Sequence, residues 1–187
     1  IGGITVTGLN PDSQQGDKVI LDILKRCGGK FKPVEGGLHF DRSLLKATEI
    51  DLADCPDLGP ILFTLGCFCS GETVIRNAGR LRLKESDRIE AMQTELRKMG
   101  ARIEVDGDTV HIQGVALHAP NAPLSGHNDH RIVMALAVAA IASGLPALLC
   151  GAEAVDKSWP AFWSVLRGLG AKVELNTDKQ EEFDIKA

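Results

Sequence analysis

Three segments of the chain resemble one another at nearly equal spacing, and this repeat constrains the fold more than any other feature. They are Cys27–Phe31, Met99–Ile103 and Leu169–Val173, and their first glycines fall 72 and then 70 residues apart. Each segment follows an amphipathic helical pattern and precedes a short β-prone run. A glycine there ends a helix in the left-handed conformation that glycine adopts at little cost. The sequence therefore predicts a fold made of repeated units.

A second pair of segments supports the repeat. Ser70–Ile75 matches Ser143–Leu148 at a shift of 73 residues. A long apolar helix is predicted before each, over 58–69 and 132–142, with almost no polar positions. Because a helix that is apolar on every side must be buried, we expect both to lie between layers of the fold.

Each unit is predicted to contain a strand, a buried helix, a strand, an amphipathic helix and two more strands. The fold class is therefore α/β, in βαβαββ units. In the middle unit, whose last two strands are joined by a hairpin turn at 106–108, these elements are expected at 49–52, 57–70, 72–76, 86–99, 101–105 and 109–113. The first unit has a strand at 4–7, a helix near 16–27 and two strands, but lacks the opening strand and buried helix. We predict one lobe with a partial unit at 1–47, a second at 48–114 and a third at 115–187.

Composition excludes several classes of protein. With 44% hydrophobic and 25% charged residues, the chain has the make-up of an ordinary globular domain. A net charge of −4 and 4% aromatic residues argue against nucleic-acid binding. The longest apolar run, 132–141, is too short to span a bilayer. The chain begins inside a predicted strand at Ile1, which suggests a fragment.

The five cysteines are an odd number without a regular framework. This pattern predicts reduced thiols in a cytoplasmic protein. Cys67 and Cys69 stand in an apolar run, so we expect them to be buried as small hydrophobic residues.

Chemically useful residues gather where the buried helices are expected to begin. Under the 73-residue shift Asp57 aligns with His130, and Arg131 follows. Helix amino-termini offer free N–H groups and partial positive charge, which suit anions. The alternatives are that Asp57 is an N-cap or first-turn carboxylate of its helix, and that Asn128 or Asp129 caps the other helix beside a solvated arginine.

His127 and His130 raise the possibility of a metal site. Two histidines three residues apart are only half of one, and no third ligand lies nearby in the sequence. No metal is therefore expected.

The densest charged segment is 80–88, which reads RLRLKESDR. Its basic residues precede or enter the first turn of a predicted helix, where the helix dipole disfavours cations, so an anion could share the site. A solvated helix start capped by Ser86 or Asp87 explains the segment equally well. Glu85 becomes a plausible proton carrier if a ligand excludes water from it.

The corresponding loop of the third unit is 154–160. Pro160 suits a first helical turn and Ser158 a cap, which would place Lys157 at the start of a helix. Arg88, Arg131 and Lys157 would then mark three helix starts. If the repeat brings these together, they form a pocket for phosphate and carboxylate groups.

These motifs resemble those of a known family. Arg82–Ile89 is similar to a signature segment of the 3-phosphoshikimate 1-carboxyvinyltransferases (EPSP synthases). Asn128–Arg131 before an apolar helix, Lys157–Pro160 and Asp54–Asp57 resemble three further blocks, and the similarity covers essentially the whole chain. It implies two lobes of three βαβαββ units each, which form an inside-out α/β barrel around an interlobe cleft. This chain would be most of the carboxy-terminal lobe.

The resemblance also implies an activity. The family transfers the enolpyruvyl group of phosphoenolpyruvate to the 5-hydroxyl of shikimate 3-phosphate, in aromatic amino acid biosynthesis, and is the target of glyphosate. Asp57 would accept the hydroxyl proton, Glu85 would exchange a proton at the methylene carbon, and Lys84 would lie near both substrates. No cofactor or metal is implied.

The remaining roles concern substrate binding. Arg88, Arg131 and Lys157 would bind phosphoenolpyruvate, and His130 would line the site. Arg80 corresponds to a contact with the shikimate phosphate, although some members have asparagine there. The partner would be the amino-terminal lobe, without which the chain is expected to be inactive. The alternatives are UDP-N-acetylglucosamine enolpyruvyl transferase and a non-catalytic anion-binding fragment.

Overall fold

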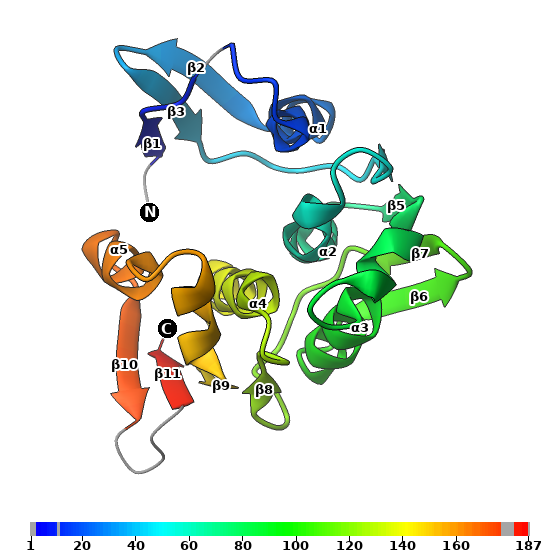
Figure 1. Ribbon diagram of the computed structural model, residues 1–187, viewed down its shortest axis with the longest axis vertical. Coiled ribbons are helices and arrows are strands. Elements are labelled where there is room, and N and C mark those ends of the chain that lie inside the picture. Colours follow the sequence, from blue (N-terminus) through cyan, green and yellow to red (C-terminus); the bar gives the residue numbers. More distant parts are fainter. Residues whose placement is uncertain (1–2, 11, 177–181, 187) are drawn as a thin grey trace.

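The computed structural model describes residues 3–10, 12–176 and 182–186. Its strands form three small sheets, which lie around the outside of the molecule with the helices α2 and α4 between them (Figure 1). The α/β class expected from the repeat is confirmed.

The second sheet shows the complete pattern of one unit. Its spatial order is β4 (Glu49–Asp51), β5 (Glu72–Arg76), β7 (Thr109–Gln113) and β6 (Arg102–Asp106). β4 is parallel to β5, and the other two pairings are antiparallel. Gly107 adopts φ +56° in the turn between β6 and β7, as a tight hairpin requires.

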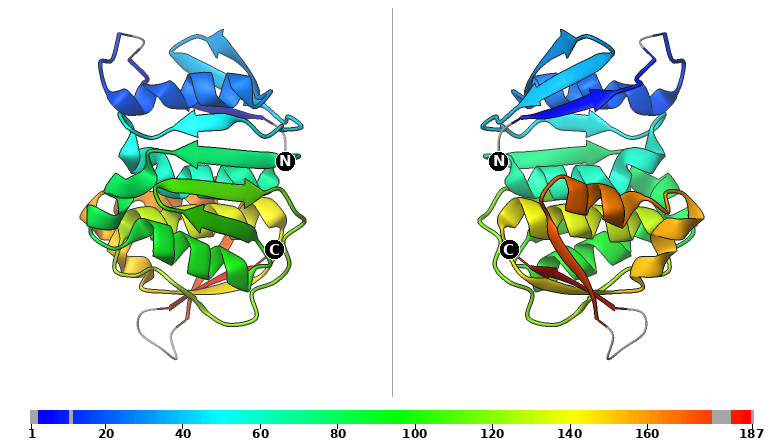
Figure 2. Two further views of the ribbon diagram at one scale, coloured as in Figure 1. Left: turned by 90° about the vertical axis from the view of Figure 1, so that its right-hand side faces the viewer. Right: turned by 90° about the vertical axis from the view of Figure 1, so that its left-hand side faces the viewer.

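The other two sheets repeat this order. In the third sheet it is β8 (Leu124–Ser125), β9 (Ala147–Cys150), β11 (Glu182–Lys186) and β10 (Lys172–Asn176), again with a parallel first pair. The first sheet has β1 (Ile4–Thr7), β3 (Gly37–Asp41) and β2 (Lys30–Val34). Among the described residues no strand corresponds to β4 or β8 beside β1. Figure 2 shows the first sheet stacked above the second. The division of the chain into three units stays a prediction.

Two apolar helices form the centre of the core. They are α2 (Gly59–Phe68), which follows the short 3-10 helix η2 (Pro56–Leu58), and α4 (His130–Ser143). The two pack against each other, and the Thr64 hydroxyl donates to the carbonyl of Ala135 at 3.0 Å. Burial of both helices is confirmed.

The amphipathic helix α3 (Arg88–Lys98) packs against α2, α4 and β6. Its carboxylate cap is Asp87, which accepts from the backbone N–H groups of Ile89 and Glu90. A 3-10 helix η1 (Gly16–Val19) and α1 (Ile20–Arg26) form the helix predicted near 16–27. Gly28, Gly100 and Gly170 have φ values of 83°, 85° and 95°, so all three repeat glycines end their helices as predicted.

One predicted helix start is wrong. Lys157 is the last residue of the 3-10 helix η4 (Ala152–Lys157), and α5 (Phe162–Gly168) begins five residues later. Within the described chain, α5 has no side-chain cap, so Ser158 does not cap it. The tight turn that follows Lys157, in which the N–H of Trp159 bonds the carbonyl of Val155 at 2.7 Å, delays the helix beyond Pro160.

No disulfide joins any of the five cysteines in the described residues, and Cys67 and Cys69 are buried as predicted. Burial raises the pKa of each of these two thiols to about 12, which keeps them protonated and unreactive. No helix in the described part of the chain combines the length and apolar character needed to cross a membrane.

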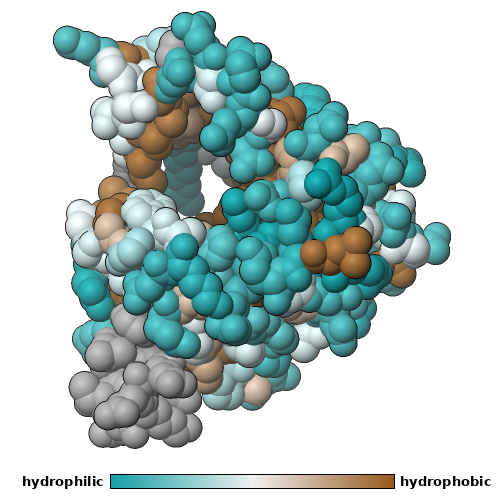
Figure 3. All heavy atoms as spheres, viewed as in Figure 1, coloured by the Kyte–Doolittle hydropathy of each residue, from teal (hydrophilic) through white to brown (hydrophobic). Residues whose placement is uncertain are grey.

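The first sheet is much less buried than the other two. Every residue of β1 is exposed, whereas Thr73 and Ile75 of the corresponding strand β5 are buried. In the space-filling view, apolar residues gather along the side of this sheet that faces a hollow (Figure 3).

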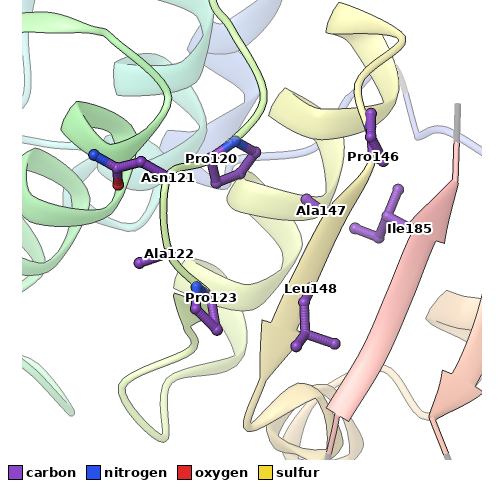
Figure 4. Close-up of a pocket in the computed structure, with 8 residues that line it drawn as sticks. All are labelled: Pro120, Asn121, Ala122, Pro123, Pro146, Ala147, Leu148 and Ile185. Atoms are coloured by element: carbon purple, nitrogen blue, oxygen red, sulfur yellow. The ribbon is translucent and has the colours of Figure 1, made fainter.

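A cavity of about 410 Å³ opens beside β9, between residues 120–123, residues 146–148 and Ile185 (Figure 4). It lies where the chain before β8 leaves its neighbour β9, because Pro120 and Pro123 have no N–H to continue the ladder. Its described lining residues carry no charge, so it is not suited to an anionic ligand.

Candidate functional site

Three helix starts meet at the carboxylate of Asp57. The Lys84 ammonium lies 3.0 Å from Oδ1, Arg88 Nη1 lies 3.1 Å from the same oxygen, and Arg131 Nη2 lies 3.1 Å from Oδ2. Arg131 Nη1 also donates to the Asp57 carbonyl at 3.1 Å. Residues from the starts of α2, α3 and α4 are thereby tied together, although up to 74 positions separate them in the chain.

Arg88 is the most buried member of this cluster, with 1% of its surface exposed. Its guanidinium donates to three carboxylates: Asp57, Glu85 at 2.6 Å and Asp129 at 2.8 Å from Nε. A buried arginine requires such pairing, because an unpaired charge out of water is very costly. Arg88 is therefore fully engaged with protein groups here, and an anion would have to compete with them.

Asp129 is the carboxylate that anchors Arg88 from the other side. It is completely buried, caps α4 by accepting from the Arg131 N–H at 2.9 Å, and accepts from the Ser86 hydroxyl at 3.0 Å. Burial by itself raises the pKa of Asp129, but the hydrogen bond from Arg88 leads the contacts that outweigh it and lower that pKa. The sequence suggested Asp129 only as a cap, and its contact with Arg88 was missed.

The cations around Asp57 also decide its protonation. Partial burial raises the pKa of Asp57, but the hydrogen bond from Lys84, followed by the charge of Arg131, outweighs burial and holds this pKa below its ordinary value. Asp57 lies in the first turn of η2 and makes no side-chain cap among the described residues, so the first-turn alternative describes its place and the N-cap alternative is wrong. It is an ionised carboxylate held by three cations.

The charged segment 80–88 serves two purposes. Asp87 caps α3, as the solvated alternative proposed, and it also pairs with Arg82 at 3.1 Å. Lys84, Glu85 and Arg88 nevertheless turn to the Asp57 cluster. Arg80, in the 3-10 helix η3 (Ala78–Leu83), is exposed and donates to the Ala53 carbonyl at 3.1 Å. No contact in the described structure joins it to Asp57.

Lys157 lies beside the cluster without joining it. Its ammonium donates to the carbonyl and the side-chain oxygen of Asn128, each at 2.6 Å. Since Asn128 directly precedes Asp129, Lys157 is linked to the cluster through the start of α4. His130 begins α4, and its buried Nδ1 has no hydrogen-bond partner among the described residues.

The histidine pair considered for a metal does not converge. His127 Nε2 lies 3.1 Å from Glu95, on the side of α3, whereas His130 belongs to α4. The described residues contain no group of three histidine, cysteine, aspartate or glutamate side chains placed to hold a metal ion. The site can supply an ionised carboxylate base, a second carboxylate and several cations.

The sequence of the chain is similar to those of known proteins. Residues 1–166 match the family described as EPSP synthase (3-phosphoshikimate 1-carboxyvinyltransferase). The chain is 44% identical over 172 residues to the 3-phosphoshikimate 1-carboxyvinyltransferase of Clostridium acetobutylicum, covering 92% of this chain and 40% of the relative. The enzyme of that name from Methanocaldococcus jannaschii is 40% identical over 173 residues, with the same two coverages.

A solved structure of a protein with the same family name has a similar fold. The EPSP synthase of Acinetobacter baumannii superimposes with a TM-score of 0.75 and 26% identity, over 89% of this chain and 42% of that one. The inside-out α/β fold implied by the resemblance is confirmed by this match. The chain spans about 40% of the length of the curated relatives it matches. It belongs to the EPSP synthase (3-phosphoshikimate 1-carboxyvinyltransferase) family.

Proposed function

We propose that the protein containing this chain transfers the enolpyruvyl group of phosphoenolpyruvate to the 5-hydroxyl of shikimate 3-phosphate. The observation that carries the proposal is the ionised carboxylate of Asp57, which lies where α2, α3 and α4 begin. Lys84, Arg88 and Arg131 hold this carboxylate. A base surrounded by cations suits a reaction in which a hydroxyl loses a proton next to an anionic reactant.

The first half of the reaction is an addition. Asp57 takes the proton of the 5-hydroxyl as its oxygen attacks carbon 2 of phosphoenolpyruvate, and Glu85 delivers a proton to the methylene carbon. The product is a tetrahedral intermediate that still carries the phosphate. Glu85 reaches this region because Arg88 holds it at 2.6 Å.

The second half is an elimination. Glu85 takes a proton back from the methyl carbon, the double bond re-forms in the enolpyruvyl product, and the carbon–oxygen bond to phosphate breaks. The proton that Asp57 accepted passes to the leaving phosphate, which restores both carboxylates. Lys84 lies 3.0 Å from Asp57, where its charge can stabilise groups from both substrates. The chemistry needs a base, an acid and cationic clamps.

Phosphoenolpyruvate binding is assigned to Arg88, Arg131 and Lys157. Arg131 is one-third exposed and Lys157 is exposed, so both can meet an incoming anion. Arg88 is enclosed by Asp57, Glu85 and Asp129, so an anion must displace at least one carboxylate from it. His130 would line this pocket. Glyphosate would occupy it in place of phosphoenolpyruvate.

Shikimate 3-phosphate is assigned to Asp57 and Lys84, with Arg80 as a further phosphate contact. Arg80 is directed at the Ala53 carbonyl in this structure and must turn to serve that role. The other binding groups would come from an amino-terminal lobe of the same protein. A cytoplasmic location fits five cysteines, none of which forms a disulfide in the described part of the chain.

The test is an acceptor comparison with the full-length protein. Phosphate release from phosphoenolpyruvate should occur with shikimate 3-phosphate and not with UDP-N-acetylglucosamine. Asp57→Asn should abolish turnover while leaving the fold intact. Release with the nucleotide sugar alone would favour the sister enzyme, and release with neither acceptor would leave a non-catalytic anion-binding protein.

A further inference from the structure

Glu95 is a buried acidic residue that the proposed chemistry does not use. It lies on α3, two turns beyond Arg88, and only 1% of its surface is exposed. Buried carboxylates are rare unless they are paired. Glu95 Oε2 accepts from the Ser125 N–H at 2.8 Å and from Lys98 at 2.7 Å, and Oε1 lies 3.1 Å from His127 Nε2.

The segment that Glu95 holds is strained. His127 and Asn128 have φ values of +50° and +54°, a conformation that costs free energy in residues other than glycine and persists only where the surroundings impose it. The His127 N–H is held by the Ser125 hydroxyl at 3.2 Å. Gly126 is fixed by its N–H bond to the Cys150 carbonyl at 2.8 Å, and a Cβ there would collide with Val133.

The other end of this segment reaches the candidate site. Asn128 receives both hydrogen bonds of the Lys157 ammonium. The next residue, Asp129, caps α4 and holds Arg88. Glu95 therefore holds Ser125 and His127 of segment 125–128. The last residue of the segment, Asn128, positions Lys157 and directly precedes the cap of α4.

We infer that Glu95 and His127 are positioning residues, which hold segment 125–128 and through Asn128 fix the place of Lys157. Neither is assigned a contact with substrate. The inference rests on the proposed function in one respect: Lys157 is one of the three cations given to phosphoenolpyruvate. It predicts a loss of affinity for that ligand alone.

The test uses the full-length protein with Glu95→Gln and His127→Ala. Each should raise KM for phosphoenolpyruvate on the order of tenfold, because a displaced cation binds its anion poorly. The turnover number and KM for shikimate 3-phosphate should stay near those of the unchanged protein. Amide exchange over residues 125–130 should rise in both. The effects should not add in the double variant, since both residues act through one contact.

Two matched variants serve as controls. Glu90→Gln removes an exposed carboxylate from the same helix and should change neither KM nor exchange. His127→Gln keeps a donor that can reach Glu95 and should restore much of the affinity that His127→Ala loses. Failure of this rescue would overturn the pairing of the two residues.

The inference is also overturned if both primary variants keep the original KM and exchange rates. A fall in turnover with both KM values unchanged would show a folding role instead. If Glu95→Gln does not fold, His127→Ala decides, because its side chain is 34% exposed and tolerates truncation. If the unchanged protein shows no turnover, the proposed function fails, and exchange over 125–130 still decides the positioning role.

Discussion

Arg131 reaches back along the chain to bind Asp57 twice, with Nη1 on the carbonyl and Nη2 on the carboxylate, both at 3.1 Å. Asp57 lies in η2, directly before α2, and Arg131 lies in the first turn of α4, so the contact joins the starts of the two helices at the centre of the core. A cation that we propose to bind phosphoenolpyruvate thus pairs with the carboxylate that we propose as the base. The proposed roles therefore predict that ligand binding and release of the base are coupled.

Arg131→Ala in the full-length protein should weaken phosphoenolpyruvate binding by about 1.5–3 kcal/mol, the worth of a charge-assisted contact. Shikimate 3-phosphate binding alone should change much less. Titration calorimetry with each ligand measures both. Arg167→Ala, which removes an arginine from the far α5, is the control and should leave both affinities unchanged. Equal loss of both ligands in Arg131→Ala would indicate damage to the fold.

Acid should destabilise the chain through Asp129. Its pKa is lowered in the folded state, so its contribution to stability is fully present above the ordinary carboxyl value of about 4 and is lost as pH falls through the lower folded value. Asp57 has the same direction of shift and adds to this dependence. Thermal unfolding between pH 7 and pH 2 measures it.

Asp129→Asn should lower the melting temperature at pH 7 and flatten its decline in acid. The loss at neutral pH follows because Arg88 would remain buried with one carboxylate fewer. Asp22→Asn, at an exposed position of α1, should leave the pH profile unchanged. An Asp129→Asn profile parallel to the original would contradict the assignment.

Many of these helices and turns can be predicted from the sequence, because each depends on a short pattern of neighbouring residues. The glycine helix stops, the apolar helices α2 and α4 and the hairpin at Gly107 each depend on a few neighbouring residues. Aligning two of the repeated units places Asp57 and His130, with Arg131 beside it, at helix starts, but the contact between Asp57 and Arg131 is seen only in the structure. The family resemblance then assigns roles that no local pattern contains.

Other features depend on contacts between distant segments and escape such reasoning. Lys157 resembles a helix-start residue, but its ammonium is directed by Asn128 in another loop. Glu95 has the spacing of an ordinary charge on an amphipathic helix, and only the fold shows that it is buried against segment 125–128. In the sequence Arg88 looks like a surface cation, because its three carboxylate partners are scattered over positions 57–129. They are Asp57, Glu85 and Asp129.

The exposed apolar side of the first sheet should bind a hydrophobic dye. Ile4 and Val6 are 42% and 38% exposed, and their cross-strand partners Phe40 and Leu38 lie on the same face. Contiguous apolar surface of this kind promotes association. The double variant Ile4→Thr/Val6→Thr should reduce dye fluorescence while retaining the strands, because threonine also favours β structure.

Leu169→Thr is the control for that experiment, since Leu169 is 52% exposed but lies at the end of α5. It should leave dye binding unchanged. A chain that stays monomeric and binds no dye at high concentration would contradict the prediction.

The chain of 187 residues by itself should not catalyse the reaction. Its Asp57 cluster contains the proposed base and cations, but the lone chain spans only about 40% of the length of its relatives. The free energy that orients two anionic substrates comes from enclosing them, and an open half-site leaves them in water, where each ionic contact is weak. Phosphate release from phosphoenolpyruvate and shikimate 3-phosphate should therefore stay at background.

Adding the remainder of the full-length protein as a separate polypeptide should restore some turnover if the two parts associate. The control is the same mixture with Asp57→Asn in the 187-residue chain, which must remain inactive. Detectable phosphate release by the lone chain, purified free of full-length enzyme, would show that the contacts around Asp57 suffice for catalysis. The proposal that the site is divided between two lobes would then be wrong.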